Sequence, residues 1–103
     1  MQLAPLIFAA VSLAADAAHA QKAPVLLQKY DCYLCHADRE ARTGPAFVDV
    51  ADKHRGKPQA TATLIAVVRK SVHGSGLWPM PPLPQVPVAD AKTVIAYILA
   101  LKS

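Results

Sequence analysis

Two cysteines and a histidine stand close together at Cys32, Cys35 and His36. Thiols three positions apart can each add to a vinyl group of one porphyrin, and the imidazole that follows can then bind the porphyrin iron. The C-x-x-C-H order therefore predicts one haem c, attached covalently through both cysteines, with His36 as an axial ligand of the iron.

The same pair of thiols is compatible with two other kinds of site. A thiol–disulfide motif would not require His36, and it is expected between a strand and a helix. A zinc site needs further ligands, which would have to include His54 or His73 because the chain has only two cysteines. Neither histidine forms a recognisable ligand pair, so haem attachment is favoured.

Met80 is the candidate ligand for the opposite side of the iron. It is the only methionine after residue 20, and it lies in a stretch with five prolines between positions 79 and 87. Prolines fix the backbone near polyproline geometry, so this loop would present one thioether sulfur in one place. A thioether opposite an imidazole raises the reduction potential. The alternatives are that Met80 fills the core, or that His54 or His73 is the ligand.

Three further contacts with the haem group are conceivable. A metal-bound histidine usually donates its other ring N–H to a fixed acceptor, and the carbonyl of Pro45 is the candidate acceptor for His36. The indole of Trp78 is either a core residue or a donor to a haem propionate. The charged ends of Arg69 and Lys70 could pair with propionates or be simply solvated.

The spacing of apolar residues predicts the helices that would hold these groups. About four short helices are expected: Val25–Cys35, Ala46–His54, a third from Thr61 or Thr63 to about Val72, and Ala89–Lys102. One of the two threonines is expected to cap the third helix, and Asp90 to complement the dipole of the fourth. No alternating strand pattern is present, so the predicted fold class is all-α.

The first 20 residues are typical of a secretory signal peptide. An apolar run from Leu3 to Ala15 precedes small residues at Ala18 and Ala20, which suit cleavage. The run is shorter than the about 20 residues that span a bilayer. We expect a cleaved signal over 1–20, one domain over 21–103, and no stable membrane insertion after cleavage.

The chain is basic, with a formal charge of +4 over 103 residues, and all 11 lysines and arginines follow residue 20. A basic surface speeds encounter with acidic partners. The alternative explanation is that the charge only keeps the protein soluble. No run of Lys or Arg resembles a nucleic-acid-binding arm, so no nucleic-acid partner is expected.

Four stretches together resemble the class I c-type cytochromes, and most closely the small bacterial periplasmic monohaem carriers. They are the C-x-x-C-H motif, Thr43–Phe47, Gly74–Pro82, and the C-terminal helix with Tyr97. The likeness covers essentially all of residues 21–103. It implies a class I cytochrome c fold in which the first and last helices cross, with Leu27 near Tyr97 and Ile98.

The resemblance also implies the roles of the site residues. Cys32 and Cys35 would bind haem covalently, His36 and Met80 would be the axial ligands, and the Pro45 carbonyl would hold His36. The implied function is single-electron transfer in the periplasm by a protein that is not an enzyme. It would be a monomer or a small subunit, and would meet dehydrogenases, reductases or oxidases that have acidic docking surfaces.

Two rival functions remain compatible with these residues. A haem enzyme or gas sensor would need an open or labile position where Met80 is expected. A dedicated electron-accepting subunit of a periplasmic dehydrogenase would look the same in sequence.

Overall fold

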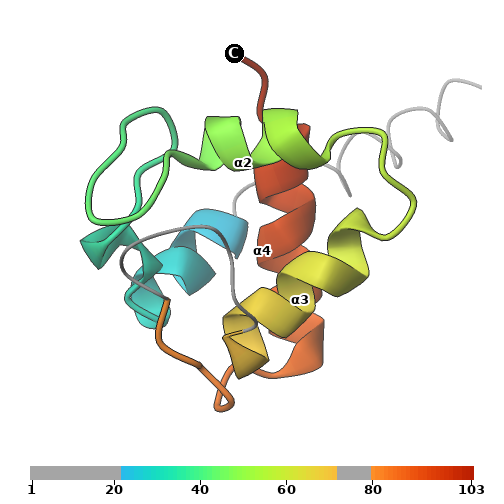
Figure 1. Cartoon of the computed structure of the whole chain (residues 1–103). Coiled ribbons are helices and arrows are strands. Elements are labelled where there is room, and N and C mark those ends of the chain that lie inside the picture. Colours follow the sequence, from blue (N-terminus) through green and yellow to red (C-terminus); the bar gives the residue numbers. More distant parts are fainter. Residues whose placement is uncertain (1–21, 72–79) are drawn as a thin grey trace, which may run out of the picture.

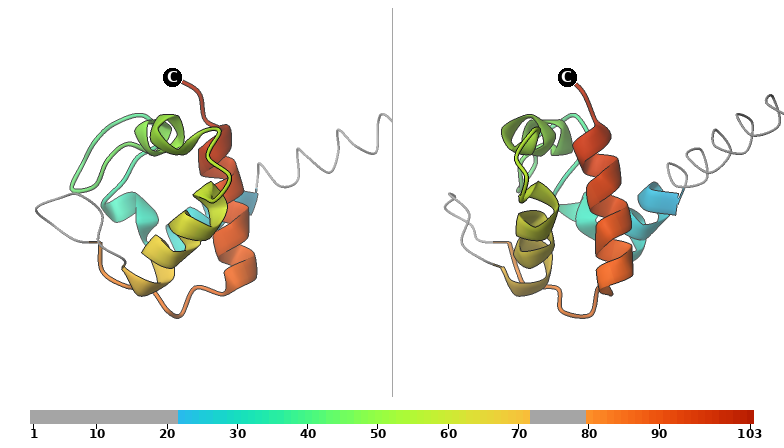
Figure 2. Two further views of the ribbon diagram at one scale, coloured as in Figure 1. Left: turned by 45° about the vertical axis from the view of Figure 1, so that its right-hand side comes forward. Right: turned by 90° about the vertical axis from the view of Figure 1, so that its right-hand side faces the viewer.

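The computed structural model describes residues 22–71 and 80–103, and these residues form helices and loops without strands. The chain is helical over 22–29, and continues through η1 (Cys32–Leu34), α2 (Phe47–His54), α3 (Ala60–Lys70) and α4 (Val88–Ala100). Figures 1 and 2 show α2 and α3 crossing the same side of α4, against which both pack. The predicted all-α class is confirmed.

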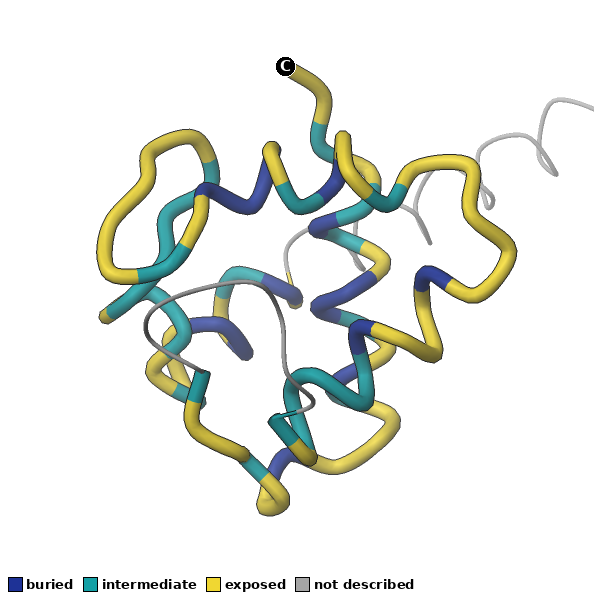
Figure 3. Tube along the Cα trace, in the orientation of Figure 1, coloured by how far each residue is buried: buried dark blue, intermediate teal, exposed yellow. Residues whose placement is uncertain are grey.

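One hydrophobic cluster joins the first helix, α2, α3 and α4. Its buried members are Leu26, Leu27, Phe47, Leu64, Val94, Ile95 and Ile98, and Tyr97 packs against them. Leu27 and Ile95 are each only 1% exposed, and burial of such a side chain stabilises the fold by about 1.5–3 kcal/mol. Figure 3 shows buried positions concentrated along α4 and where its neighbours meet it. The first and last helices therefore pack together, as the resemblance implied.

The first helix ends earlier than its spacing predicted. The expected helix Val25–Cys35 is wrong at its end, because the regular helix stops at residue 29 and Asp31 adopts a left-handed conformation with φ of 63°. Asp tolerates this region better than most residues. The motif then forms its own tight turn, in which the backbone N–H of His36 donates to the Cys32 carbonyl at 3.0 Å.

The second and third helices differ from expectation at their starts. Ala46, expected inside α2, is its N-cap residue, and α2 ends at His54 as predicted. The expected threonine cap of α3 is wrong: Gln59 precedes the helix and no side chain caps it. Because α3 begins at Ala60, Thr61 and Thr63 already lie within the helix, two and four positions after its N-cap residue.

The proline-rich segment forms neither helix nor strand over residues 80–87, as expected. It is tied to the end of α3: the Leu83 N–H donates to the Val68 carbonyl at 2.8 Å, and the Arg69 Nε–H donates to the Val86 carbonyl at 3.0 Å. The predicted turn Gly74–Gly76 and the expected α3 residue Val72 lie outside the described residues.

The last helix starts and ends within two residues of its prediction. Asp90 lies in its first turn, where a carboxylate complements the helix dipole. Asp90 also accepts a hydrogen bond of 2.7 Å from the Tyr30 hydroxyl, which joins the end of the first helix to the start of α4.

Candidate functional site

A cavity of about 460 Å³ lies between the helices, and Cys32, His36 and Met80 all line it. Its walls are mainly aliphatic side chains of α3 and α4, which include Leu64, Val67, Val68, Val94, Ile95 and Ile98. Cavities of this size and character hold cofactors and other small molecules. Met80 thus lines the same apolar space as His36 and Cys32, although it follows them by 44 and 48 positions in the sequence.

The orientation of the His36 ring is set by a backbone carbonyl. Its Nδ1 lies 2.7 Å from the carbonyl oxygen of Pro45. A carbonyl can only accept a hydrogen bond, so Nδ1 must carry the proton. In the neutral imidazole this leaves the lone pair of Nε2 free for a metal ion.

The His36 ring is also confined by its neighbours. It stacks on the Phe47 ring, with centroids 4.9 Å apart and planes at 19°. A Cβ atom added to Gly44 would lie 2.4 Å from His36 Cε1, so residue 44 must be glycine for this packing. The sequence predicted the Pro45 carbonyl as the acceptor, but not that glycine at residue 44 makes room for the imidazole.

The two cysteines are half-buried and form no disulfide with each other. Burial raises the pKa of the Cys32 thiol above its ordinary value. A redox-active thiol normally has a lowered pKa, so this environment does not favour the thiol–disulfide alternative. Over residues 22–71 and 80–103 no group of three or more His, Cys, Asp and Glu side chains could hold a metal ion.

The backbone of Met80 is held from the end of α3, where the Ser71 hydroxyl donates to the Met80 carbonyl. Arg69, considered above as a partner for propionates, instead donates to the Val86 and Pro84 carbonyls of the same loop. Trp78 lies outside the described residues.

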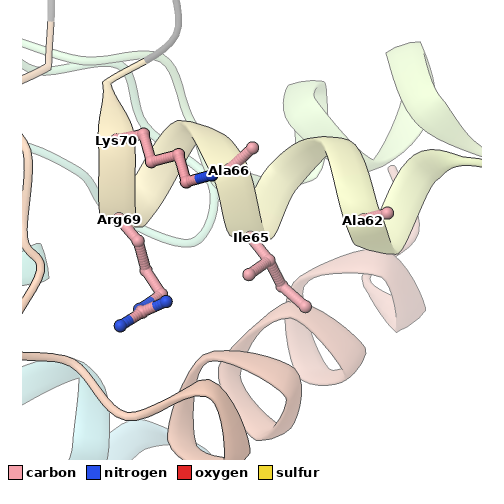
Figure 4. A pocket seen from close by; sticks show the side chains of 5 residues that line it. All are labelled: Ala62, Ile65, Ala66, Arg69 and Lys70. Carbon is pink, nitrogen blue, oxygen red and sulfur yellow. The ribbon is translucent and has the colours of Figure 1, made fainter.

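Arg69 and Lys70 line a different hollow from the central cavity. This hollow, of about 290 Å³, follows α3 and is completed by Ala62, Ile65 and Ala66 (Figure 4). Neither basic side chain is among the residues that line the central cavity.

Two groups of polar residues were not predicted from sequence. Asp38 accepts hydrogen bonds from the hydroxyls of Tyr33 and Tyr97, at 3.0 and 2.5 Å. No local signal could reveal the second bond, because its partners are 59 positions apart. The other group, Lys53 and His54 with Asp49, lines the cavity from α2, and only the helical spacing of these residues hinted at a shared face.

The chain is similar to several known cytochromes c, which agrees with the site described above. It is 45% identical over 80 residues to cytochrome c-551 of Allochromatium vinosum, covering 75% of this chain and 83% of that protein. It is 38% identical over 89 residues to cytochrome c-552 of Nitrosomonas europaea, covering 84% of each. The crystal structure of Nitrosomonas europaea cytochrome c552 matches with a TM-score of 0.73 at 36% identity, over 77% of this chain and 99% of that one.

The chain belongs to the class I c-type cytochromes. A class 1 cytochrome of Sideroxydans lithotrophicus also matches, with a TM-score of 0.69, 27% identity, and coverage of 85% of this chain and 98% of that one. No protein-family model matches the chain.

The cofactor of a class I cytochrome c is a covalent haem c with its iron, and the residues present fit that group. The Cys32 thiol lines the apolar cavity, whereas Cys35 is not among its lining residues, and the His36 ring has room there only because Gly44 has no side chain. As a c-type cytochrome, the chain transfers electrons through this haem.

Within residues 22–71 and 80–103, none of the helices has both the length and the apolar character needed to cross a membrane.

Proposed function

We propose that this cytochrome is a periplasmic electron carrier whose haem iron is bound by His36 on one side and Met80 on the other. Cys32 and Cys35 form the thioether bonds, and the Pro45 carbonyl fixes the His36 ring. The single observation that carries the proposal is the shared cavity, which is lined by Cys32, by Met80, and by a His36 ring whose Nδ1 proton is held by a carbonyl.

The role of each group follows from its chemistry. When bound, the haem supplies one iron that cycles between Fe(III) and Fe(II). His36 keeps its Nε2 lone pair directed away from its Nδ1 hydrogen bond, and the Ser71 hydroxyl holds the backbone carbonyl of Met80. With both axial positions filled, no position is open for a substrate, so the protein carries electrons and is not an enzyme.

The location and partners follow from the rest of the chain. Residues 1–20 act as a cleaved signal, and the domain over 21–103 works in the periplasm. Its basic residues favour redox partners with acidic docking surfaces, and such transient complexes are small and weak. A dedicated subunit of a periplasmic dehydrogenase is the alternative, and stable co-purification with a large partner would favour it.

The proposal is tested by Met80→Ala in the exported, haem-containing protein. Loss of the thioether should lower the reduction potential, remove the iron–thioether charge-transfer band of the oxidised protein, and let cyanide or carbon monoxide bind. Potentiometry and absorption spectra measure all three effects.

Leu83→Ala is the matched control. Leu83 lies in the same loop and is partly buried, and its hydrogen bonds to Val68 and Val86 use its backbone N–H and carbonyl, which alanine preserves. It should leave the spectrum and the potential near their original values. An unchanged potential and spectrum in Met80→Ala would refute Met80 as the ligand, and would favour the haem enzyme or gas sensor.

A further inference from the structure

The acceptor that orients the His36 ring belongs to a loop without a helix or a strand of its own. Residues 37–46 lead from the haem-binding motif to α2, at the left of the molecule in Figure 1. Segments of this kind open locally more readily than helices do, because few backbone hydrogen bonds hold them. Pro45 has no backbone N–H, so residue 45 cannot be anchored by donating a hydrogen bond. The Pro45 carbonyl must therefore be held in place by the residues beside it.

Arg42 bonds to the chain on both sides of the site. Its backbone N–H donates to the Gly44 carbonyl at 2.9 Å, in the peptide unit that immediately precedes the Pro45 acceptor. Its guanidinium Nη1 donates to the Tyr33 carbonyl at 2.8 Å, between the two cysteines of the motif. One residue therefore links the turn that holds the imidazole to the turn that holds the thiols.

Two further contacts strengthen this link. The Gly44 N–H donates to the Cys35 carbonyl at 2.7 Å, so residue 44 is bonded through its donor and its acceptor. Tyr33 is also held twice, since its hydroxyl donates to Asp38 at 3.0 Å and its carbonyl accepts from Arg42. A hydrogen bond from a guanidinium is stronger than one between neutral groups. It is also the contact that a side-chain substitution removes without changing the motif or the turn at residue 44.

We propose that Arg42 is a positioning residue for the iron ligand: by binding the Tyr33 carbonyl, it keeps the Pro45 carbonyl against Nδ1 of His36. This inference rests on the proposed function, because it treats His36 as a ligand of the haem iron. Arg42 is exposed and is not among the residues that line the central cavity. It therefore acts through the backbone and not by touching the cofactor.

The consequence for the iron follows from the Nδ1 hydrogen bond. A carbonyl that accepts from Nδ1 fixes the orientation of the ring and raises the basicity of Nε2. Without the guanidinium the loop should open more often, which exposes the Nδ1 proton to water and leaves Nε2 a weaker donor. A weaker donor stabilises Fe(III) less, so the reduction potential should rise. Loss of the arginine charge acts in the opposite direction, because a nearby cation disfavours Fe(III).

The test compares Arg42→Met with Arg39→Met in the exported, haem-containing protein. Both arginines are exposed residues of the same loop, and each donates from Nη1 to a backbone carbonyl at 2.8 Å. The acceptor of Arg39 is the carbonyl of Lys102, after the last helix. Arg39→Met therefore removes an equal charge and a similar hydrogen bond without loosening the motif.

Hydrogen exchange measured by NMR gives the direct readout. The His36 Nδ1 proton and the Gly44 amide should exchange about tenfold faster in Arg42→Met than in the parent, which corresponds to about 1.4 kcal/mol of local stability. Both rates should stay near the parent values in Arg39→Met. The Ile98 amide, inside α4, reports unfolding of the whole domain and should respond about equally to the two substitutions.

The reduction potential gives a second readout, which a merely structural role would not move. At about 1 M salt the field of an exposed charge is screened within about 3 Å, so the effect of the lost charge is largely removed. Under this condition Arg42→Met should have a higher potential than the parent, whereas Arg39→Met should match it. Arg42→Lys keeps the charge and a donor for the Tyr33 carbonyl, and should restore most of the slow exchange.

The inference is overturned if the Nδ1 proton exchanges no faster in Arg42→Met than in Arg39→Met, if Arg42→Lys restores nothing, or if the potential at high salt does not rise. The proton signals of the His36 ring separate this failure from failure of the proposed function. Ring signals that the oxidised, paramagnetic iron does not shift would contradict the proposed ligation and the inference together. Shifted ring signals without an effect of Arg42 would contradict the inference alone.

Discussion

At the scale of single residues, the absence of a side chain at position 44 is as important to the site as the ligand itself. The His36 ring lies where a Cβ on residue 44 would be, and the carbonyl of the next residue holds its Nδ1. One glycine-proline pair therefore sets both the position and the tautomer of the imidazole.

Gly44→Ala should displace the His36 ring, since its new methyl group would lie 2.4 Å from Cε1 and 2.8 Å from both ring nitrogens. Overpacking of this kind costs about 1–3 kcal/mol of stability. Guanidinium denaturation should show the loss, and the absorption spectrum of the haem should change with it.

Gly56→Ala gives the comparison, because a Cβ there meets nothing within 4 Å but Gly56 has φ of 81°. It should lose stability of about 1 kcal/mol from backbone strain and keep the haem spectrum of the parent. If Gly44→Ala also kept that spectrum, the close approach would not govern the ligand.

At the scale of elements, the carboxylate of Asp38 joins the haem-binding segment to the last helix. It accepts hydrogen bonds from Tyr33, inside the motif, and from Tyr97 on α4. Burial, together with these bonds to Asp38, raises the pKa of both phenols above the ordinary tyrosine value.

The raised phenol pKa values predict a loss of stability at alkaline pH. The contribution of each tyrosine is complete below its ordinary pKa of about 10, and is lost as pH rises toward the higher pKa of the folded state. The guanidinium midpoint should therefore be steady up to about pH 9.5 and fall as the pH rises above about 10. Tyr33→Phe should reduce this fall, whereas Thr61→Ala, an exposed substitution in α3, should not. An equal fall in all three proteins would contradict the role of the phenols.

The apolar spacing of the sequence predicted the helices, but it did not predict all of their ends. The apolar spacing of α4 predicted its bounds to within two residues, because its buried face repeats at helical intervals over 13 residues. The break at Asp31 was missed, since it depends on one left-handed residue that Asp tolerates without requiring it. The Asp38 contacts and the α2 side of the cavity depend on packing between distant segments, which no local pattern records.

At the scale of the whole molecule, the cavity stands where a small domain would normally have its core. A haem in this space would remove the remaining exposed apolar surface of its lining from water, which stabilises by about 25 cal/mol per Å². A typical domain is stable by only about 5–15 kcal/mol, so this burial matters to the whole fold. The helices and the haem must therefore be stable together.

Cys32→Ser/Cys35→Ser should consequently yield a chain without covalent haem and without a cooperative unfolding transition. Haem staining after denaturing electrophoresis and far-ultraviolet circular dichroism in denaturant measure the two effects. Leu34→Ser is the control, because this motif side chain is 73% exposed and should be dispensable for both. Retained staining or an unchanged midpoint in the double variant would contradict the prediction.

The packing of the helix over 22–29 against α4 has a consequence for how the chain matures. The two halves of this contact are separated by most of the domain, so the interior cannot close until the final helix has been made and delivered. Chains emerge with their N-terminal end first, so both thiols are synthesised well before that helix. The order of synthesis therefore leaves Cys32 and Cys35 on an open polypeptide until the last helix is complete.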